Sequence, residues 1–485
     1  MSAVRGRRLN YLWGNRPGST APGGVTSVPE NPSFPRGMAL LVAGSLFMEI
    51  LDATIIVPAI PLIAASFGVE PIDVNVAISA YLVTVAVLIP ASGWLADRFG
   101  TRRVFIGAIA VFTLASVGCA VSVSLPQLVL MRVLQGVGGA MMVPVGRLAV
   151  LRRSSKSDLV RAIALLTWPA LTAPVLAPVL GGAIATLGSW RWIFAVNIPI
   201  GVIGVVLALT LVRGEPEAGA RSLDWPGLLA LTSGIAAALI ALEHIRVSGT
   251  DWGLVAGCGA AAVLLLAVAV CRLLAAATPL VQLRVLRVHT LRITVLAGSL
   301  YRLVITAVPF LLPLQFQLEF GWTPLAAGVM VAALFAGNLT VKPITTPLMR
   351  RFGIRTVLLV NGLASVACFG LLAALRPGLP VALMAVVLYL SGALRSIGFT
   401  AYNSLAFSDV EGEELTHANT LNASVQELAA GLGVAVAALL LSQLAHSGSG
   451  YALTYLVLGG LLALTLVATM RWPRRAGAHV SGHRV

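Results

Sequence analysis

Two acidic residues lie inside a long apolar stretch near the amino terminus. Glu49 and Asp52 are the charged residues of the run 38–63. Three residues apart, they share one face of a helix, and at about 1.5 Å of rise per residue they lie near the middle of a bilayer. Two carboxylates in a medium of low polarity cannot both stay ionised at low cost, so at least one is expected to bind a proton. The pair predicts a proton carrier or a binding point for a cation, the alternative being a structural pair satisfied by neighbouring helices.

An arginine in a later apolar stretch is the natural partner for these acids. Arg132 lies within the run 126–148 and is followed by Gly136, Gly138 and Gly139. A guanidinium buried in a membrane requires an acceptor, and the carboxylates of the first span are candidates. The glycines allow a neighbouring helix to approach closely. A nucleotide-binding loop is excluded, because these glycines lie within a span and no strand precedes them.

Three further polar residues lie inside later apolar runs. Arg302 is eleven residues into its expected span, too deep to reach water easily, which favours a place in an internal cavity. Gln426 and Glu427 lie partway along another span. Either they line the cavity opposite the first span, or Glu427 pairs with a neighbouring base. The other basic residues within spans lie near the expected inner ends, where long side chains reach water: Arg147, Lys342 and Arg395.

The elements that position these residues are membrane-spanning helices. Hydrophobic residues make up 58% of the 485-residue chain and charged residues 11%, and the mean hydropathy is +0.93. These values exclude an ordinary soluble domain. The long apolar runs predict an all-α polytopic membrane protein with fourteen spans. The seventh and eighth spans, Trp225–Leu242 and Trp252–Leu274, are rich in alanine and bracketed by charged residues.

The placement of basic residues predicts the orientation of the spans. Most of the 33 Lys and Arg residues lie in the tails and in alternate loops, which places those loops and both termini in the cytoplasm. The basic residues expected in the loops on the opposite face are only three: Arg191, Arg246 and Arg376. One cytoplasmic loop is acidic, but acidic residues have little influence on topology. The net charge of +15 therefore reflects topology, and no nucleic-acid partner is expected.

A short repeat divides the chain into two halves. Phe-Gly-Thr-Arg-Arg at 99–103 follows the second span and Phe-Gly-Ile-Arg-Thr at 352–356 follows the tenth, so both segments are expected on the cytoplasmic face. This placement is typical of two parallel halves related by an axis along the membrane normal. The expected organisation is a disordered cytosolic tail (1–36), a six-helix bundle (37–212), two inserted transmembrane helices with an inner loop (213–287), a second six-helix bundle (288–472) and a basic cytosolic tail (473–485).

The loop after the second span resembles the signature loop of the major facilitator superfamily. It reads Gly-Trp-Leu-Ala-Asp-Arg-Phe-Gly-Thr-Arg-Arg over residues 93–103. The resemblance implies a conformational latch between the bundles; the alternative is a plain loop that only fixes topology. In a latch the glycines allow close packing and a tight turn, the acid meets a helix N-terminus or an arginine, and the arginines hold the loop at the anionic inner surface. The latch residues would be Gly93, Asp97, Arg98, Gly100, Arg102 and Arg103, and because Arg350 replaces the acid in the second half, the latch is expected on one side only.

The first and fourth spans narrow the resemblance to the fourteen-span drug/proton antiporter branch of this superfamily. Leu-Asp-Ala-Thr at 51–54, followed by Ala-Ile-Pro at 59–61, is similar to the first-span motif of the branch, although Val57 replaces a common asparagine. The segment that starts at Arg132 is similar to the fourth-span motif. The resemblance implies that this arginine takes part in proton coupling.

The fifth span is similar to the antiporter motif, which within the superfamily marks exporters more than importers. Its residues here are Pro174, Pro178, Gly181 and Gly182, with Ala177 in place of a glycine. The prolines kink the helix and the glycine pair lets a partner helix close over it. Residues 190–201 also match the branch, and their aromatic side chains are expected to form a belt at the outer interface.

The resemblance implies a proton-coupled antiporter that exports small amphipathic or drug-like molecules by alternating access. An exporter of a dedicated metabolite, siderophore or lipid with the same fold is the alternative. The expected partners are the lipid bilayer, the substrate and protons, and the expected location is the bacterial inner membrane. No cofactor, metal or nucleotide is expected, since neither Lys156 nor Lys342 follows a glycine as an ATP-binding loop requires. An enzyme is not expected, because no extramembrane segment is large enough for a catalytic domain and no nucleophile–base set stands out.

Overall fold

All regular structure in the described part of the chain is helical. The computed structural model describes residues 36–470 and 472, apart from 154–158, 213–222, 246–249, 277–278, 411–413 and 445–448. Both predicted tails lie outside the described residues, except for Arg36. The first tail is 1–36 and the second is 473–485. Within the described ranges there is no strand, which confirms the predicted fold class.

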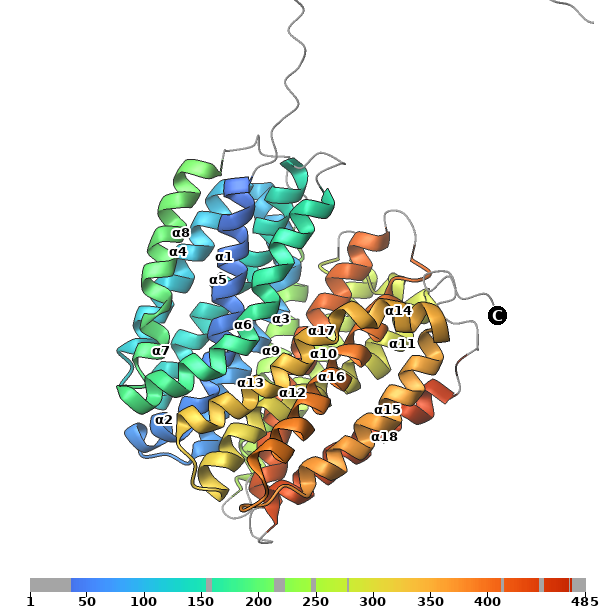
Figure 1. Cartoon of the computed structure of the whole chain (residues 1–485). Helices are drawn as coiled ribbons and strands as arrows, with labels where there is room; N and C mark the ends of the chain where they lie inside the picture. Colours follow the sequence, from blue (N-terminus) through green and yellow to red (C-terminus); the bar gives the residue numbers. More distant parts are fainter. Residues whose placement is uncertain are drawn as a thin grey trace, which may run out of the picture. The chain divides into compact units, whose positions relative to one another are not determined.

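The first group of helices comprises α1–α8, and within it α1 is packed between other helices. Helix α1 packs on α5, α6 and α8, while α5 also packs on α3 and α4. This group lies together at the blue-to-green side of Figure 1. Its elements are α1 (Arg36–Ile55), η1 (Val57–Ala59), α2 (Ile60–Phe67), η2 (Pro71–Val74), α3 (Asn75–Phe99), α4 (Thr101–Ala120), α5 (Leu125–Arg153), α6 (Leu159–Leu187), α7 (Trp192–Ala195) and α8 (Asn197–Leu211).

Two helices follow the first group and pack against each other. They are α9 (Trp225–Glu243) and α10 (Trp252–Ala275), and each begins after an aspartate. Asp224 accepts a hydrogen bond from Gly227 N at 3.0 Å, and Asp251 accepts one from Gly253 N at 3.0 Å. Such side chains satisfy the free N–H groups of a first helical turn. Helix α9 contacts both α3 and α17, so this pair lies beside both helix groups.

The second group of helices, α11–α18, has its own internal packing. Helix α13 packs on α16, α15 packs on α18 and α16, and α12 packs on α17. Two π-helical segments, η4 and η5, flank α12. The elements are η3 (Leu283–Arg287), α11 (His289–Ile293), η4 (Thr294–Gly298), α12 (Ser299–Leu314), η5 (Gln315–Glu319), α13 (Pro324–Thr340), α14 (Lys342–Phe352), α15 (Ile354–Ala373), α16 (Val381–Ala406), α17 (Glu414–Leu444) and α18 (Gly450–Met470).

The number of membrane-spanning helices agrees with the sequence. Thirteen helices or helix runs of the described chain are long and apolar enough to cross a membrane, and α13 with α14 makes a fourteenth if this bent pair is one span. The pair bends by 47°. The break falls at Val341, just before Pro343. Proline lacks an N–H group and crowds the preceding turn, so a continuous helix over 324–352 is not favoured.

In each half, an arginine of the repeat binds the C-terminal end of the last helix. The glycine of each repeat, Gly100 and Gly353, has a positive φ of 83° and 77° respectively. Two residues later, Arg102 Nη2 donates to Leu209 O at 2.7 Å, and Arg355 Nη2 donates to Met470 O at 2.8 Å. Both carbonyls lie at the C-terminus of a helix, where a positive charge is favourable. The repeated arginine therefore caps α8 in one half and α18 in the other.

We expect Arg102→Gln and Arg355→Gln to destabilise the protein to a similar extent. Each loses a charge-assisted hydrogen bond at a helix C-terminus, which is worth about 1 kcal/mol. Thermal unfolding of the purified variants in detergent measures this. Arg98→Gln, an exposed arginine of the same loop, is the matched control and should unfold like the parent. Loss of stability in only one of the two variants would contradict the equivalence of the two caps.

The two helix groups are joined near their predicted outer ends. Gln317 Nε2 donates to Pro58 O at 3.0 Å and Leu325 N donates to Thr186 Oγ1 at 3.2 Å. Farther along the interface, Ser79 Oγ donates to the carbonyl of Gly431 at 3.3 Å. Contacts between α6 and α13 and between α3 and α17 surround these bonds. In the described chain, the hydrogen bonds between the groups thus gather toward the end that carries η1 and η2.

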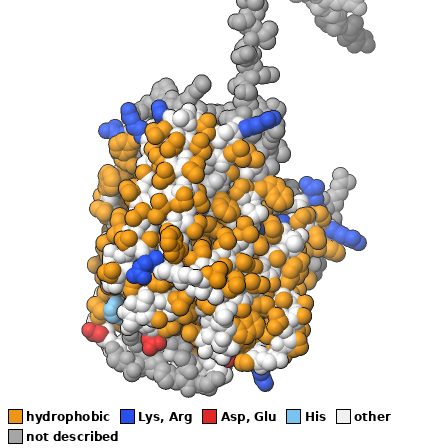
Figure 2. Space-filling model, turned by 60° about the vertical axis from the view of Figure 1, so that its left-hand side comes forward, with side chains coloured by type: hydrophobic (Ala, Val, Ile, Leu, Met, Phe, Trp, Pro, Cys, Tyr) orange, Lys and Arg blue, Asp and Glu red, His pale blue; other side chains and the backbone are white. Residues whose placement is uncertain are grey.

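The lateral surface suits a lipid environment. Figure 2 shows hydrophobic side chains over most of the visible face, with most Lys and Arg side chains toward its edges. Several large apolar residues of the described helices are exposed, including Leu114, Leu264 and Val360. In water such a surface would be unfavourable, whereas hydrocarbon chains solvate it.

Candidate functional site

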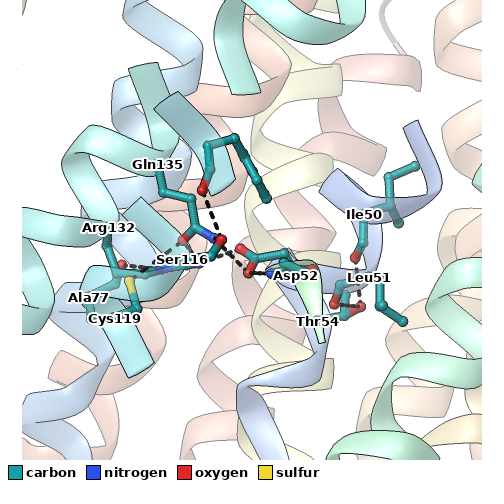
Figure 3. A network of polar contacts seen from close by, with 11 residues as sticks. Ile50, Leu51, Asp52, Thr54, Ala77, Ser116, Cys119, Arg132 and Gln135 are labelled. Carbon is teal, nitrogen blue, oxygen red and sulfur yellow. Dashed lines mark hydrogen bonds and ion pairs between the residues drawn. The ribbon is translucent and has the colours of Figure 1, made fainter. Parts of the chain in front are cut away.

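Asp52 lies at the centre of a buried polar network. Its carboxylate forms an ion pair with Arg132 Nη1, accepts a hydrogen bond from Gln135 Nε2 at 2.8 Å, and accepts one from Asn197 Nδ2 at 2.6 Å. Figure 3 shows these contacts around Asp52, except the one with Asn197, which it does not label. Asp52, Arg132, Gln135 and Asn197 are all fully buried. The predicted pairing of Arg132 with a first-span carboxylate is confirmed.

Arg132 has several acceptors around its guanidinium. Besides Asp52, Nη1 donates to Gln135 Oε1 at 2.7 Å and Nε donates to Ala77 O at 3.4 Å. The guanidinium carbon lies 4.3 Å from the centre of the Tyr81 ring. A cation over an aromatic face is favourable, and more so where water is excluded. The charge of Arg132 is therefore balanced within the first helix group.

Four helices supply the network, which explains its depth. Asp52 comes from α1, Arg132 and Gln135 from α5, and Asn197 from the start of α8. Ser116 of α4 accepts a further hydrogen bond from Gln135 Nε2 at 2.8 Å. Most polar side-chain atoms here have a hydrogen-bond partner, although Arg132 Nη2 and Asn197 Oδ1 have none among the described residues. Such pairing is the condition for keeping charges inside a membrane. The network holds α1, α4, α5 and α8 in fixed relation.

Glu49 lies one turn before Asp52 but in a different environment. It is half-buried, and within the described part of the chain it takes part in no ion pair or hydrogen bond. A Cβ placed on Gly139 of α5 would lie 3.3 Å from Glu49 Oε1, so the carboxylate lies directly over that glycine. Glu49 interacts electrostatically with Glu427 of the second helix group and with Arg147. It is thus a half-buried acid within electrostatic range of the second helix group.

Arg302 and Glu427 form an ion pair within the second helix group. Arg302 Nη2 lies 3.7 Å from Glu427 Oε1, with 18% and 32% of the two side chains exposed. Arg302 also lies over the ring of Phe399, 4.9 Å from its centre. Of the two alternatives for Glu427, pairing with a neighbouring base is confirmed. Glu427 also interacts electrostatically with Glu49, so these two acids of different helix groups repel each other when both are ionised.

Three other polar residues of the spans have different surroundings. Gln426 is buried, and its Oε1 has no hydrogen-bond partner among the described residues. Lys342 donates from Nζ to Thr400 Oγ1 at 3.1 Å. Arg147 is exposed, as expected for a side chain near a helix end. Arg395 differs from the expectation, because it lines a cavity between α12, α13, α15 and α16.

The predicted latch residues lie at the turn between α3 and α4. Gly100 makes the predicted tight turn, since its φ of 83° is unfavourable for other residues. Close packing at Gly93 is not found: a Cβ there would meet no atom within 4 Å. Arg102 binds the end of α8, in its own helix group. A latch between the groups therefore stays a prediction.

The glycines of the antiporter motif make close helix contacts. A Cβ on Gly181 would overlap the backbone carbonyl of Ile55, and one on Gly182 would overlap the carbonyl of Pro324. Pro178 lies opposite a third glycine, Gly328 of α13, which is equally close to the Pro178 carbonyl. Pro174 lies one turn earlier in α6. The motif thus places α6 against α1 on one side and against α13 of the other group.

The predicted aromatic belt at residues 190–201 is wrong for two of its three aromatic members. Trp190 and Phe194 are buried, whereas Trp192 is 63% exposed. Trp190 Nε1 donates to Ser66 Oγ at 3.0 Å and its ring packs edge-on against Phe67. A tryptophan satisfies its single polar group equally well inside a protein or at an interface, so composition alone does not decide between them.

Gln135 and Asn197 are functional candidates that the sequence did not single out. Both lie in matched motifs, and Gln135 is three residues from Arg132, hence on the same helix face. That spacing was a usable signal. Asn197 had a weaker one, since it precedes Pro199 at the start of α8 and a capping role was equally natural. Only the packing of α8 on α1 brings it to Asp52.

Comparisons with known proteins agree with this fold. The family model of the Major Facilitator Superfamily matches residues 42–434 and 294–484. The chain is 36% identical over 466 residues to a Cronobacter sakazakii protein named "Putative multidrug resistance protein MdtD", covering 93% of this chain and 96% of that one. A Salmonella paratyphi A protein of the same name is 36% identical over 464 residues, with 93% and 97% covered.

Solved transporter structures share the fold at low sequence identity. A POT family transporter in complex with 5-aminolevulinic acid gives a TM-score of 0.67 at 14% identity, covering 90% of this chain and 96% of that one. A D-xylose-proton symporter gives 0.65 at 15% identity, with 92% and 99% covered. The homologues and the fold are those of transporters and not of enzymes. The chain belongs to the major facilitator superfamily of membrane transporters.

Proposed function

We propose that the protein is a proton-coupled antiporter that exports small amphipathic molecules by alternating access. One observation carries the proposal: Glu49 is a half-buried acid at mid-span that forms no ion pair or hydrogen bond among the described residues and interacts electrostatically with Glu427 of the other helix group. Asp52, one turn away, is instead held by Arg132, Gln135 and Asn197. We therefore assign proton carriage to Glu49 and a structural role to the Asp52 network.

The charge of Glu49 is suited to control the relation between the helix groups. Two ionised carboxylates repel each other. Glu427 is paired with Arg302, whereas Glu49 interacts electrostatically with Arg147 but forms no ion pair among the described residues. A proton on Glu49 removes this repulsion, so proton occupancy shifts the balance between two arrangements. Inward movement of one charge supplies about 2.3 kcal/mol per 100 mV of membrane potential.

The contacts between the groups support alternation around this cluster. The hydrogen bonds that join them lie toward the predicted outer end, and the close approach of α6 and α13 depends on Gly182 and Gly328. Breaking a few such bonds costs little compared with unfolding a helix. We infer that this structure represents the state closed on the outer side, and that the other state closes at the latch loop 93–103.

The relatives named for multidrug resistance support amphipathic substrates and a bacterial inner-membrane location. An exporter of a dedicated metabolite, siderophore or lipid is the second candidate. One observation favours it. The guanidinium of Arg395 and the hydroxyl groups of Ser365 and Ser391 line one cavity, and a purely apolar drug would offer them no hydrogen-bond acceptor.

A proton-flux assay in proteoliposomes tests the proposed function. The purified full-length chain is reconstituted with a pH-sensitive dye inside, and a pH gradient is imposed. Norfloxacin, ethidium and 2-naphthoate serve as zwitterionic, cationic and anionic probes. We expect at least one probe to release protons in exchange for its own movement, and no release in protein-free vesicles. Probe movement that ignores the gradient, or no coupled flux with any of the three, would contradict the proposal.

A further inference from the structure

Arg395 of α16 is a charged residue without an acidic partner. Its Nη1 donates to the carbonyl of Ile305 at 3.3 Å, and its guanidinium lies 5.5 Å from the centre of the Phe335 ring. Among the described residues it forms no ion pair. It lies well inside α16, more than two turns from either end. A cation held at this depth without a counter-charge is costly unless a ligand supplies one.

The charges near Arg395 do not compensate it. Arg302 is close enough to repel Arg395, and Glu427 is already paired with Arg302 at 3.7 Å. The acid of the first group, Glu49, interacts electrostatically with Glu427 and with Arg147. Glu49, Glu427, Arg302 and Arg395, each of which interacts with the next, form a charged cluster of two acids and two bases, with Arg147 as a further base beside Glu49. When Glu49 carries a proton, the cluster has a net positive charge, and that charge resides on the second helix group.

A cavity beside Arg395 offers further hydrogen-bond donors. Water-sized groups can occupy about 20 Å³ of it, which is room for one small polar group. Ser365 and Ser391 line it, and Ser365 Oγ is buried without a hydrogen-bond partner among the described residues. The hydroxyl of Tyr301 is already engaged, since it donates to Leu394 O at 3.1 Å. A guanidinium with adjacent hydroxyl groups matches the acceptor oxygens of a carboxylate.

We propose that the exported molecule carries a carboxylate-type anionic group, which binds to Arg395 with Ser365 and Ser391 beside it. The inference rests on the proposed function and adds the substrate class. The remainder of the molecule lies against the apolar residues around the cluster. Proton binding at Glu49 and anion binding at Arg395 then act at the two ends of this charged cluster, so that the proton and the substrate each change its net charge.

Ligand-dependent thermal unfolding tests this proposal. Three probes share one ring system and differ in charge: 2-naphthoate, 2-naphthamide and (2-naphthylmethyl)trimethylammonium. In the purified full-length protein we expect only 2-naphthoate to raise the unfolding temperature, by roughly 5 °C at saturation. Arg395→Gln should weaken its half-saturating concentration at least about tenfold, and Arg395→Lys should weaken it less. Arg376→Gln, which removes an exposed loop arginine, is the matched control and should respond like the parent.

Several outcomes overturn the proposal. They are equal stabilisation by the amide or the cation, an unchanged response of Arg395→Gln, no response of the parent to 2-naphthoate, and equal stabilisation by chloride, which would indicate a simple ion site. Because the other three outcomes compare ligands on the unaltered chain, a poorly folded Arg395→Gln variant does not obscure them. Proton-coupled transport of ethidium alone would refute the anionic class and leave the proposed function standing, whereas anion binding without coupled flux would do the reverse.

Discussion

Replacement of Glu49 by glutamine is expected to abolish proton-driven transport while leaving substrate exchange intact. Glutamine keeps the shape of the side chain and cannot exchange a proton. The variant therefore resembles the protonated state, in which repulsion between Glu49 and Glu427 is absent. Exchange of labelled for unlabelled substrate needs only movement between the two arrangements. Movement against a gradient needs the proton and should fall at least about tenfold.

The measurement compares two assays on the same reconstituted protein. Efflux driven by an imposed pH gradient reports coupling, and counterflow at uniform pH reports exchange. Glu319→Gln removes an exposed acid of η5 and is the matched control for the loss of one negative charge. Equal loss in both assays would mean that Glu49 serves binding or folding. Full activity in both would exclude it as the proton carrier.

The sequence predicts the helices and the central ion pair for the same physical reason. Charged side chains are so unfavourable in an apolar span that Asp52 and Arg132 stand out in the sequence, and each requires the other. Hydrophobic length alone then yields the span count. The bend at Val341 interrupts one predicted span, and Pro343 accounts for it. These features depend on local composition, which a single chain displays directly.

The rest of the site depends on packing between distant segments. Glu49 of α1 interacts electrostatically with Glu427 of α17, and no local sequence pattern encodes the packing that brings these two helices within range. Arg395 likewise has no acidic partner among the described residues, and this depends on which side chains pack around it in the folded chain. Trp190 was misplaced for a related reason, since burial or exposure at a helix end is decided by the partner helix. A polar amide such as Gln135 carries no charge, so its burial does not require a charged partner. The sequence alone therefore does not predict its place in the site.

Replacement of Asp52 by asparagine is expected to act mainly on stability. It leaves Arg132 fully buried without its counter-ion, and the loss of one partner of such a pair costs about 3–5 kcal/mol. Thermal unfolding of the purified variant should therefore begin several degrees lower than in the parent. Glu49→Gln, which breaks no ion pair of the described chain, should unfold close to the parent. The two acids of one helix thus separate into a stabilising role and a transport role.

A double-mutant cycle turns this contrast into a measurement of the pair. In Arg132→Gln, Asp52 keeps the hydrogen bonds from Gln135 and Asn197, so the remaining charge is partly solvated by amide donors. The combined Asp52→Asn, Arg132→Gln variant removes both charges and should be more stable than the sum of the single losses predicts. If Asp52→Asn instead kept its stability and lost proton coupling, the roles assigned to Asp52 and Glu49 would be exchanged. The network around Arg132 would then be the element that releases the proton.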